Sequence, residues 1–314
     1  MTSLRKLGSS DLQVFPLALG GNVFGWTADE AQSFAVLDAY SAAGGNFVDT
    51  ADAYSAWVPG NEGGESETVI GKWLAARSNR SDIVVATKVG AHPAYKGLSA
   101  ATIKSAAEES LRRLGTDHID LYYTHFDDET VPVEEIITAL DQLVKEGKVR
   151  EIAASNISPE RLQASLDFSE REGLARYIAL QPHYNLVSRD TYEGALQETA
   201  ARAGLAAVPY SALASGFLTG KYRPGTSVES ARAEKAGGHL ETERGQKVLA
   251  ALDKVARERD AEVATVALAW LAARPTVAAP IASARTVEQV PALVAVAGLQ
   301  LTGQELAELT EASA

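Results

Sequence analysis

The sequence of 314 residues contains no cysteine, which excludes disulfide bonds, thiolate catalysis and cysteine-ligated zinc or iron–sulfur clusters. Basic residues are also few. The 29 Lys and Arg against 41 Asp and Glu leave a net charge of −12, which argues against nucleic acid or an anionic membrane as the main partner. No apolar stretch reaches the ~20 residues of a membrane helix, and the first residues lack the apolar core of a signal peptide. We therefore expect a cytoplasmic protein.

The remaining composition, 46% hydrophobic and 22% charged, is that of a globular protein. Short β-branched runs alternate with amphipathic helical stretches, and most of these runs are apolar on both faces, as in buried parallel strands. The predicted strands are residues 17–20, 46–49, 83–87, 119–123, 150–154, 177–181, 206–210 and 276–281. Eight strands, each followed by a helix, favour a (β/α)8 TIM barrel over an open doubly wound sheet.

Helix ends and loops complete this predicted organisation. Capping boxes at 27–30 and 302–305 indicate two helix starts, and the stretch from Ser99 to Gly115 has both a cap and a stop. Residues 4–15 predict a β-hairpin before the first barrel strand, and residues 222–245, rich in Pro, Gly and charge, predict a long loop after the seventh strand. No segment has the composition of a linker, so we expect a single barrel domain over 1–314.

Common site motifs are missing. No G-x-G-x-x-G follows a strand, residues 216–221 are one position short of a phosphate-binding loop, and there is no H-E-x-x-H. Candidate chemistry must therefore come from the carboxyl ends of the strands, where barrel active sites lie. Those ends carry Asp49, Tyr54, Lys88 and His125. Each alone could be a cap, a packed aromatic, a solvated charge or a wall contact, but four together on three adjacent strand ends indicate a site.

The segments around these residues resemble the aldo-keto reductases along nearly the whole chain. The matching stretches are FVDTADAY at 47–54, ESE at 65–67, VATK at 85–88, DLYYTH at 120–125, ASN at 154–156, LQPHYNL at 180–186 and PYSALASGFLTGK at 209–221. The resemblance implies a barrel enzyme that reduces a carbonyl group with a nicotinamide cofactor.

The resemblance also implies a role for each strand-end residue. Tyr54 would be the general acid that protonates the carbonyl oxygen. A phenol with a pKa near 10 is a weak acid at neutral pH, so it needs a neighbouring cation, which Lys88 would supply. Asp49 would pair with Lys88, and a neutral His125 would orient and polarise the carbonyl. No metal is required.

The implied cofactor is NADPH rather than NADH, because Arg285 at the start of the final barrel helix suits an additional 2′-phosphate. By resemblance, Tyr210 would stack on the nicotinamide ring and residues 211–221 would follow the pyrophosphate. The full set of implied cofactor contacts is Gly21, Asn22, Asp49, Ser155, Asn156, Gln181, Tyr210, Ser211, Leu213, Ser215, Gly216, Lys221, Ser283, Arg285 and Gln289. The residues alone leave other roles open: a capped turn at 155–156, a core position for Tyr210 and a solvated Lys221.

The sequence departs from the family pattern at the cofactor end of the site. Ser283 stands where glycine is common, which bears on the backbone approach to the phosphate. Ala292 and Leu293 stand where the family often has an acidic residue and an asparagine that hold the adenine. The absence of that acidic residue and asparagine puts the tightness of cofactor binding in question.

The substrate is a small-molecule carbonyl whose identity the sequence leaves open. Trp26, Trp57 and the 222–245 segment, together with Tyr54 and His125, would wall the substrate pocket. Such a pocket suggests aromatic or apolar carbonyls or sugars, unless the tryptophans are packing residues. An alternative function is an NADPH-binding regulatory subunit, similar to the β subunits of potassium channels. A glycoside hydrolase would need two facing carboxylates, which the fourth and seventh strand ends do not offer. The sequence does not indicate an oligomeric state.

Overall fold

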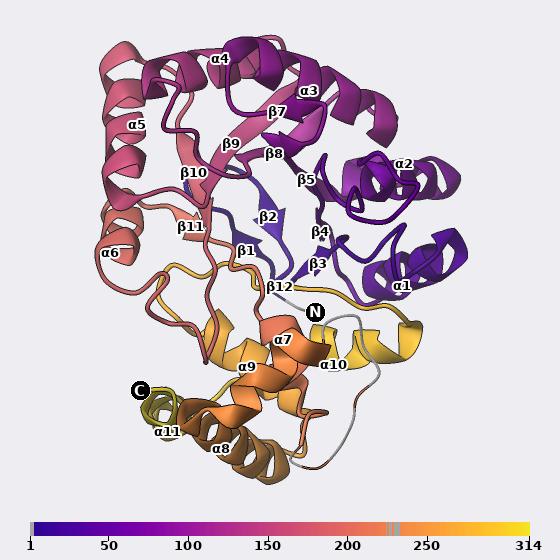
Figure 1. The fold of residues 1–314 in the computed structure, drawn as a ribbon, viewed down its shortest axis with the longest axis vertical. Coiled ribbons are helices and arrows are strands. Elements are labelled where there is room, and N and C mark those ends of the chain that lie inside the picture. Colours follow the sequence, from indigo (N-terminus) through magenta and orange to yellow (C-terminus); the bar gives the residue numbers. More distant parts are fainter. Residues whose placement is uncertain (1–2, 224, 226–227, 229–232) are drawn as a thin grey trace.

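The computed structural model describes residues 3–223, 225, 228 and 233–314. Its main sheet has eight strands, all paired in parallel, in the order β11-β10-β9-β8-β5-β4-β3-β12 (Figure 1). These strands are β3 (Ala18–Gly20), β4 (Phe47–Asp49), β5 (Val84–Val89), β8 (Ile119–Thr124), β9 (Val149–Ser155), β10 (Tyr177–Gln181), β11 (Ala206–Ala207) and β12 (Ile281–Ala282). Residues at the inner and outer faces are largely buried, as the double-sided apolar runs predict.

The segment between α9 and β12 closes this sheet into a barrel. Ala207 donates its N–H to Thr276 O and accepts from Ala278 N at 2.8 and 2.9 Å, and Ile281 N then donates to Pro209 O at 2.9 Å. β12 pairs on its other side with β3. The (β/α)8 barrel is therefore confirmed.

The predicted eighth strand over 276–281 is wrong in its extent. Only Ile281–Ala282 forms a ladder with β3. The earlier part of the segment bonds to β11 instead, through an isolated bridge between Ala207 and Val277. Pro280 has no N–H to donate, so a regular ladder cannot continue through it.

Helices surround the barrel (Figure 1). They are α1 (Glu30–Ala42), α2 (Glu65–Arg77), α3 (Ala100–Leu114), α4 (Val133–Lys145), α5 (Pro159–Glu172), α6 (Ala195–Arg202), α7 (Ala233–Gly237), α8 (Glu243–Arg259), α9 (Val263–Ala272), α10 (Val290–Val294) and α11 (Gly303–Ala312), with short 3-10 turns η1 (Arg80–Asp82), η2 (Ala214–Thr219), η3 (Gly238–Glu241), η4 (Val287–Gln289) and η5 (Ala295–Ala297). None of the described helices is both long enough and apolar enough to cross a membrane.

Three of the four predicted helix ends are observed. Ser99 caps α3, Gly115 ends it in a left-handed conformation, and Thr302 forms a capping box with Glu305 at the start of α11. The box expected at 27–30 is wrong. The structure uses Asp29 and Gln32 instead, because Thr27 N and Ala28 N bond back to Val23 in a preceding turn.

The barrel floor is covered by the predicted hairpin, which consists of β1 (Arg5–Lys6) and β2 (Gln13–Val14) paired in an antiparallel way. Leu7, Leu12 and Val14 pack on the apolar side chains inside the barrel. A second hairpin, β6 (Ala91–His92) with β7 (Tyr95–Lys96), follows β5. The floor is closed by hydrophobic contacts, and the opposite rim is the one available for a ligand.

The segment predicted as a long loop, 222–245, is only partly irregular. Its second half forms α7, η3 and the first turn of α8. Residues 224, 226–227 and 229–232 of the same segment lie outside the described residues.

Candidate active site

The four strand-end residues that the sequence singles out meet at the rim of the barrel. Asp49 ends β4, Lys88 lies near the end of β5, His125 follows β8, and Tyr54 lies in the turn after β4. The Lys88 ammonium is 2.7 Å from Asp49 Oδ2, 2.7 Å from Thr50 O and 3.1 Å from Tyr54 Oη. Both members of the Asp49–Lys88 ion pair are buried.

The Asp49–Lys88 pair keeps a positive charge beneath the phenol of Tyr54. Burial alone would lower the pKa of Lys88, but the charge of Asp49 and the contact with Tyr54 outweigh it and leave this pKa above its usual value. Gln181 at the end of β10 donates from Nε2 to the other oxygen of Asp49, at 2.8 Å. Each oxygen of the buried carboxylate is thus paired, as a buried charge requires.

The imidazole of His125 is neutral. Burial, together with the nearby charge of Lys88, lowers the pKa of His125 to about 3. Its ring stacks on Phe126, with centroids 4.8 Å apart, and meets the Tyr54 ring edge-on at 6.0 Å. Nδ1 is buried without a hydrogen-bond partner in the described chain. The ring therefore meets the cavity as a neutral group, with its orientation set by packing.

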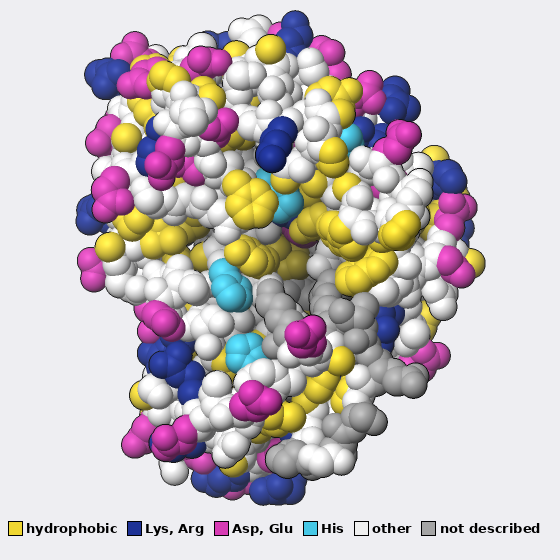
Figure 2. Space-filling model, viewed as in Figure 1, with side chains coloured by type: hydrophobic (Ala, Val, Ile, Leu, Met, Phe, Trp, Pro, Cys, Tyr) yellow, Lys and Arg dark blue, Asp and Glu magenta, His cyan; other side chains and the backbone are white. Residues whose placement is uncertain are grey.

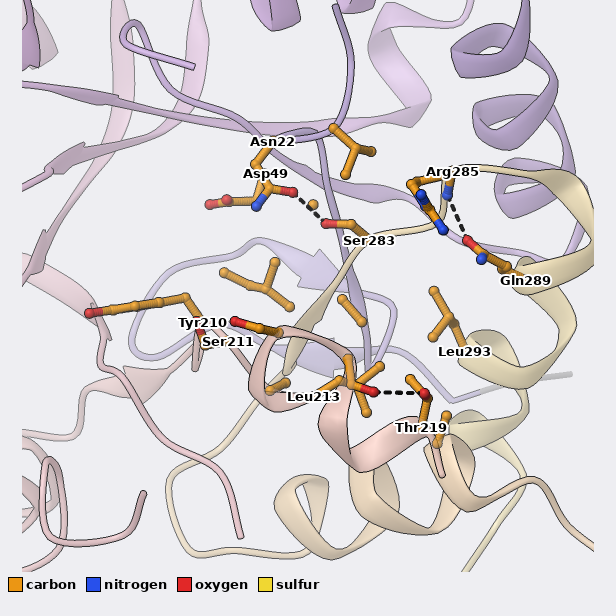
Figure 3. A pocket seen from close by; sticks show the side chains of 18 of the residues that line it. Asn22, Asp49, Tyr210, Ser211, Leu213, Thr219, Ser283, Arg285, Gln289 and Leu293 are labelled. Atoms are coloured by element: carbon orange, nitrogen blue, oxygen red, sulfur yellow. Dashed lines mark hydrogen bonds between the residues drawn. The ribbon is translucent and has the colours of Figure 1, made fainter. Parts of the chain in front are cut away.

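A cavity of about 380 Å³ opens at this rim, within the usual range for small-molecule sites. Most of the candidate residues line it: Asn22, Trp26, Asp49, Tyr54, His125, Ser155, Asn156, Gln181, Tyr210, Ser211, Leu213, Ser215, Gly216, Lys221, Ser283, Arg285 and Gln289 (Figure 3). Lys88 lies behind Tyr54 and not on the cavity surface.

Besides Lys88, two other candidate residues do not line the cavity. Gly21 faces away from it: its N–H donates to Asp49 O, and a Cβ at this position would meet Ser66 and Phe24. Trp57 is 52% exposed and meets Trp26 edge-on, with ring centroids 5.6 Å apart. It therefore stands outside the cavity, against a residue that lines it.

Ser155 and Asn156, two of the predicted cofactor contacts, are hydrogen-bonded to each other and to the barrel wall. Ser155 Oγ donates to Gln181 O, and Asn156 Nδ2 donates to His125 O. Tyr210 Oη in turn donates to Asn156 Oδ1 at 2.8 Å, while His183 stacks on the Tyr210 ring. The Tyr210 ring is consequently held in a fixed position on the cavity wall.

The opposite part of the cavity suits an anionic dinucleotide. Ala214, Ser215 and Gly216 all have positive φ, and such conformations in non-glycine residues concentrate at ligand sites. Two cations, Lys221 and Arg285, line the same cavity, although the protein as a whole is acidic. Arg285 precedes η4, and its backbone N–H donates to Gln289 Oε1 (Figure 3). The residues present therefore fit the expected cofactor.

Several lining residues were missed from the sequence. Phe126 directly follows His125, so its place at a strand end was a usable signal. Glu262 and Ala264 also line the cavity. Glu262 and Ala264 lie at the start of α9, and nothing in their local sequence indicates that this helix reaches the site.

Comparison with known proteins agrees with the geometry. The profile of the Aldo/keto reductase family matches residues 16–314. The chain belongs to this family. Among its relatives, the uncharacterized oxidoreductase YrpG of Bacillus subtilis is 36% identical, over 90% of this chain and 87% of YrpG. Protein tas of Escherichia coli is 30% identical over 97% and 95% of the two chains. The aryl-alcohol dehydrogenase [NADP(+)] of Phanerodontia chrysosporium is 31% identical over 96% and 83%.

This aldo-keto reductase also has two buried acidic residues near Lys88, Glu67 and Asp52. Glu67 is fully buried and bonded to Thr87 Oγ1 at 2.5 Å and to Arg113 Nε at 2.6 Å. Asp52 is equally buried, yet neither of its carboxyl oxygens is hydrogen-bonded to a side chain among the described residues. Burial and the charge of Glu67 raise the pKa of Asp52 well above its usual value. Asp52 is therefore a buried acid that loses its proton only at a higher pH than a free aspartate does.

Proposed function

We propose that this aldo-keto reductase reduces an aldehyde or ketone to the alcohol with NADPH, in reversible hydride transfer without a metal, and with Tyr54 as the general acid. The observation that carries the proposal is the buried Asp49–Lys88 pair in direct contact with the Tyr54 hydroxyl at the base of a cavity. Burying an ion pair costs desolvation free energy. Here the buried ammonium contacts the Tyr54 hydroxyl, which has to lose a proton in the reaction.

Tyr54 and Lys88 would act together on the carbonyl oxygen. As negative charge builds on that oxygen, Tyr54 donates its proton, and the ammonium 3.1 Å away stabilises the phenolate that remains. The ammonium does not have to move during the reaction, since Asp49 and Thr50 O already hold it in place.

His125 would orient the carbonyl. With its pKa near 3, it is neutral at physiological pH and cannot compete with Tyr54 as an acid. A neutral imidazole still donates one hydrogen bond, and Nδ1 is buried without a hydrogen-bond partner among the described residues. We assign the ring proton to Nε2, from which it would donate to the substrate.

The cofactor, when bound, supplies the hydride that reaches the carbonyl carbon. Tyr210 would hold its nicotinamide ring, with Ser155, Asn156 and Gln181 at the ring's amide. Lys221 and Arg285 would hold its phosphates, and the guanidinium of Arg285 favours the additional phosphate of NADPH. The aryl-alcohol dehydrogenase relative is named for NADP(+), which supports the same choice.

Aromatic side chains around the mouth favour an aromatic carbonyl as the substrate. Trp57 and Phe126 are both about half exposed, which is unusual for large hydrophobic residues. Trp26 lies edge-on to Trp57 and lines the cavity, and Figure 2 shows hydrophobic side chains gathered around the hollow. A flat ring can pack against these groups, whereas a sugar would leave its hydroxyl groups without partners.

NADPH oxidation, measured against a panel of aryl aldehydes, alkyl aldehydes, ketones and keto-sugars, tests the proposal. We expect sustained turnover that is fastest with aryl aldehydes. A single slow oxidation of bound NADPH without recycling would contradict the enzyme and favour the regulatory subunit. Preference for a keto-sugar would contradict only the aromatic substrate.

A further inference from the structure

Ser283 and Asn22 meet across the seam that closes the barrel. Ser283 follows β12 and Asn22 comes two residues after β3, and these two strands pair through Ala282 and Leu19. The Ser283 hydroxyl donates to Asn22 Oδ1 at 2.7 Å (Figure 3). Both side chains line the cavity. Their hydrogen bond thus continues the pairing of β12 and β3 beyond the strands, into the ligand site.

The hydroxyl of Ser283 has room only because residue 20 lacks a side chain. A Cβ built on Gly20 would lie 2.6 Å from Ser283 Oγ, closer than atoms pack. The serine is consequently held against the backbone of β3, with its hydroxyl directed at Asn22. In the structure Asn22 Oδ1 accepts this bond, so Nδ2 is the donor left over. Within the described residues Nδ2 has no hydrogen-bond partner, so it can serve a ligand.

Asn22 belongs to the catalytic end of the cavity. The residue before it, Gly21, donates its backbone N–H to Asp49 O at 2.7 Å. Arg285 lies two residues beyond Ser283 and is bonded to Gln289, away from Asp49 in Figure 3. A ligand group at Asn22 is therefore not the group that Arg285 holds.

We propose that Ser283 is a positioning residue for the dinucleotide: it fixes the Asn22 amide so that Nδ2 donates to an oxygen of the bound cofactor. This inference rests on the proposed function, because it requires a dinucleotide in the cavity. It concerns a part of the ligand that NADPH and NADH share. Ser283 therefore contributes to the affinity for both cofactors and not to the choice between them.

A double-mutant cycle on cofactor binding tests this coupling. The dissociation constants of NADPH and NADH are measured by titration calorimetry, without substrate, for the wild type, Ser283→Ala, Asn22→Ala and the double variant. We expect Ser283→Ala to weaken both cofactors by the same factor, about 3–10-fold, which corresponds to one hydrogen bond. Asn22→Ala should weaken them at least as much. The double variant should be no weaker than Asn22→Ala alone, since one residue acts through the other.

Ser165→Ala is a matched control, because this serine donates within α5 and does not line the cavity. We expect it to leave both dissociation constants unchanged. Ser283→Gly, which also removes the hydroxyl, should weaken both cofactors as Ser283→Ala does, and it guards against an effect of the methyl group that alanine keeps.

Three results would overturn the inference. Weakening of NADPH alone would mean that Ser283 acts through the loop of Arg285. Additive effects in the double variant would mean that Ser283 and Asn22 act separately, and unchanged affinity in Ser283→Ala would mean that the bond is irrelevant to binding. If the wild type binds neither dinucleotide, the proposed function fails and this inference fails with it, whereas binding without coupling refutes this inference alone.

Discussion

Asp52 offers a test of the buried electrostatics that does not depend on activity. In the folded protein this carboxyl is fully buried, neither oxygen is bonded to a side chain among the described residues, and its pKa lies well above that of a free aspartate. The unfolded chain has the ordinary aspartate pKa, near 3.9. Between these two values the folded state carries a proton at Asp52 that the unfolded state has lost.

The sign of the effect follows from that difference in bound protons. Because the folded state binds more protons, stability falls as pH rises from the unfolded pKa toward the folded pKa. The contribution of Asp52 is fully present below about pH 4 and is lost at a limiting rate of about 1.4 kcal/mol per pH unit. Asp52→Asn keeps the shape of the protonated carboxyl and removes this slope. The variant should therefore gain on the wild type steadily as pH rises above about 5.

Urea unfolding of both proteins at several pH values from 4 to 8, followed by tryptophan fluorescence and by circular dichroism, measures this difference. Coincidence of the two signals supports a two-state comparison. Asp190→Asn, with a side chain that is 82% exposed, is the control and should show no such trend. A free-energy difference between Asp52→Asn and wild type that does not change with pH would refute the reasoning, because Asp52 would then ionise alike in both states.

The remaining predictions concern the proposed catalytic and cofactor residues. Tyr54→Phe removes the proton donor, so kcat should fall by a factor of about 100 or more while the NADPH dissociation constant stays within twofold; near-normal turnover would rule out Tyr54 as the acid. Lys88→Met removes the ammonium that contacts the phenol, so turnover should fall by orders of magnitude and the pH–rate profile should shift. An unaltered profile would count against that role. Arg285→Ala should weaken NADPH by roughly 10–100-fold, as expected for a charged hydrogen bond, and NADH much less. Equal losses in calorimetry would show that Arg285 does not read the 2′-phosphate.

Local sequence predicts the barrel well where one force dominates. The runs at 84–89, 119–124 and 149–155 are strands because their apolar side chains have to be covered on both faces. Prediction fails where two local signals compete. Thr27 with Glu30 and Asp29 with Gln32 both have the spacing of a capping box, and only the preceding turn at Val23 decides between them. At 276–281, the strand-like residues bond first to β11 and then to β3. No local sequence pattern predicts this change of partner.

The same distinction holds for the site. The four strand-end residues could be grouped from sequence because the carboxyl ends of parallel strands share one rim. Which side chains touch there depends on register and on loop conformation. Gln181 reaches Asp49 across 132 positions, and Ser283 reaches Asn22 across 261. Asp52 is a residue whose burial the local sequence does not indicate. A carboxylate two residues before Tyr54 has the sequence appearance of a polar turn residue, and only the packing of α2 and β8 against it makes it a buried acid.

The two halves of the site depend on different strand pairs. The cation at Arg285 and the hydroxyl of Ser283 both lie after β12, the last strand along the chain, whereas Asp49 and Lys88 lie on β4 and β5 and Tyr54 lies in the segment between them. The ion pair beneath the phenol needs only adjacent strands. The cofactor half needs the two ends of the chain to meet at β12 and β3. The seam carries Asn22 and Ser283, whereas the ion pair joins two adjacent strands away from it. A change that loosens this seam should therefore weaken dinucleotide binding more than it disturbs the Asp49–Lys88 pair.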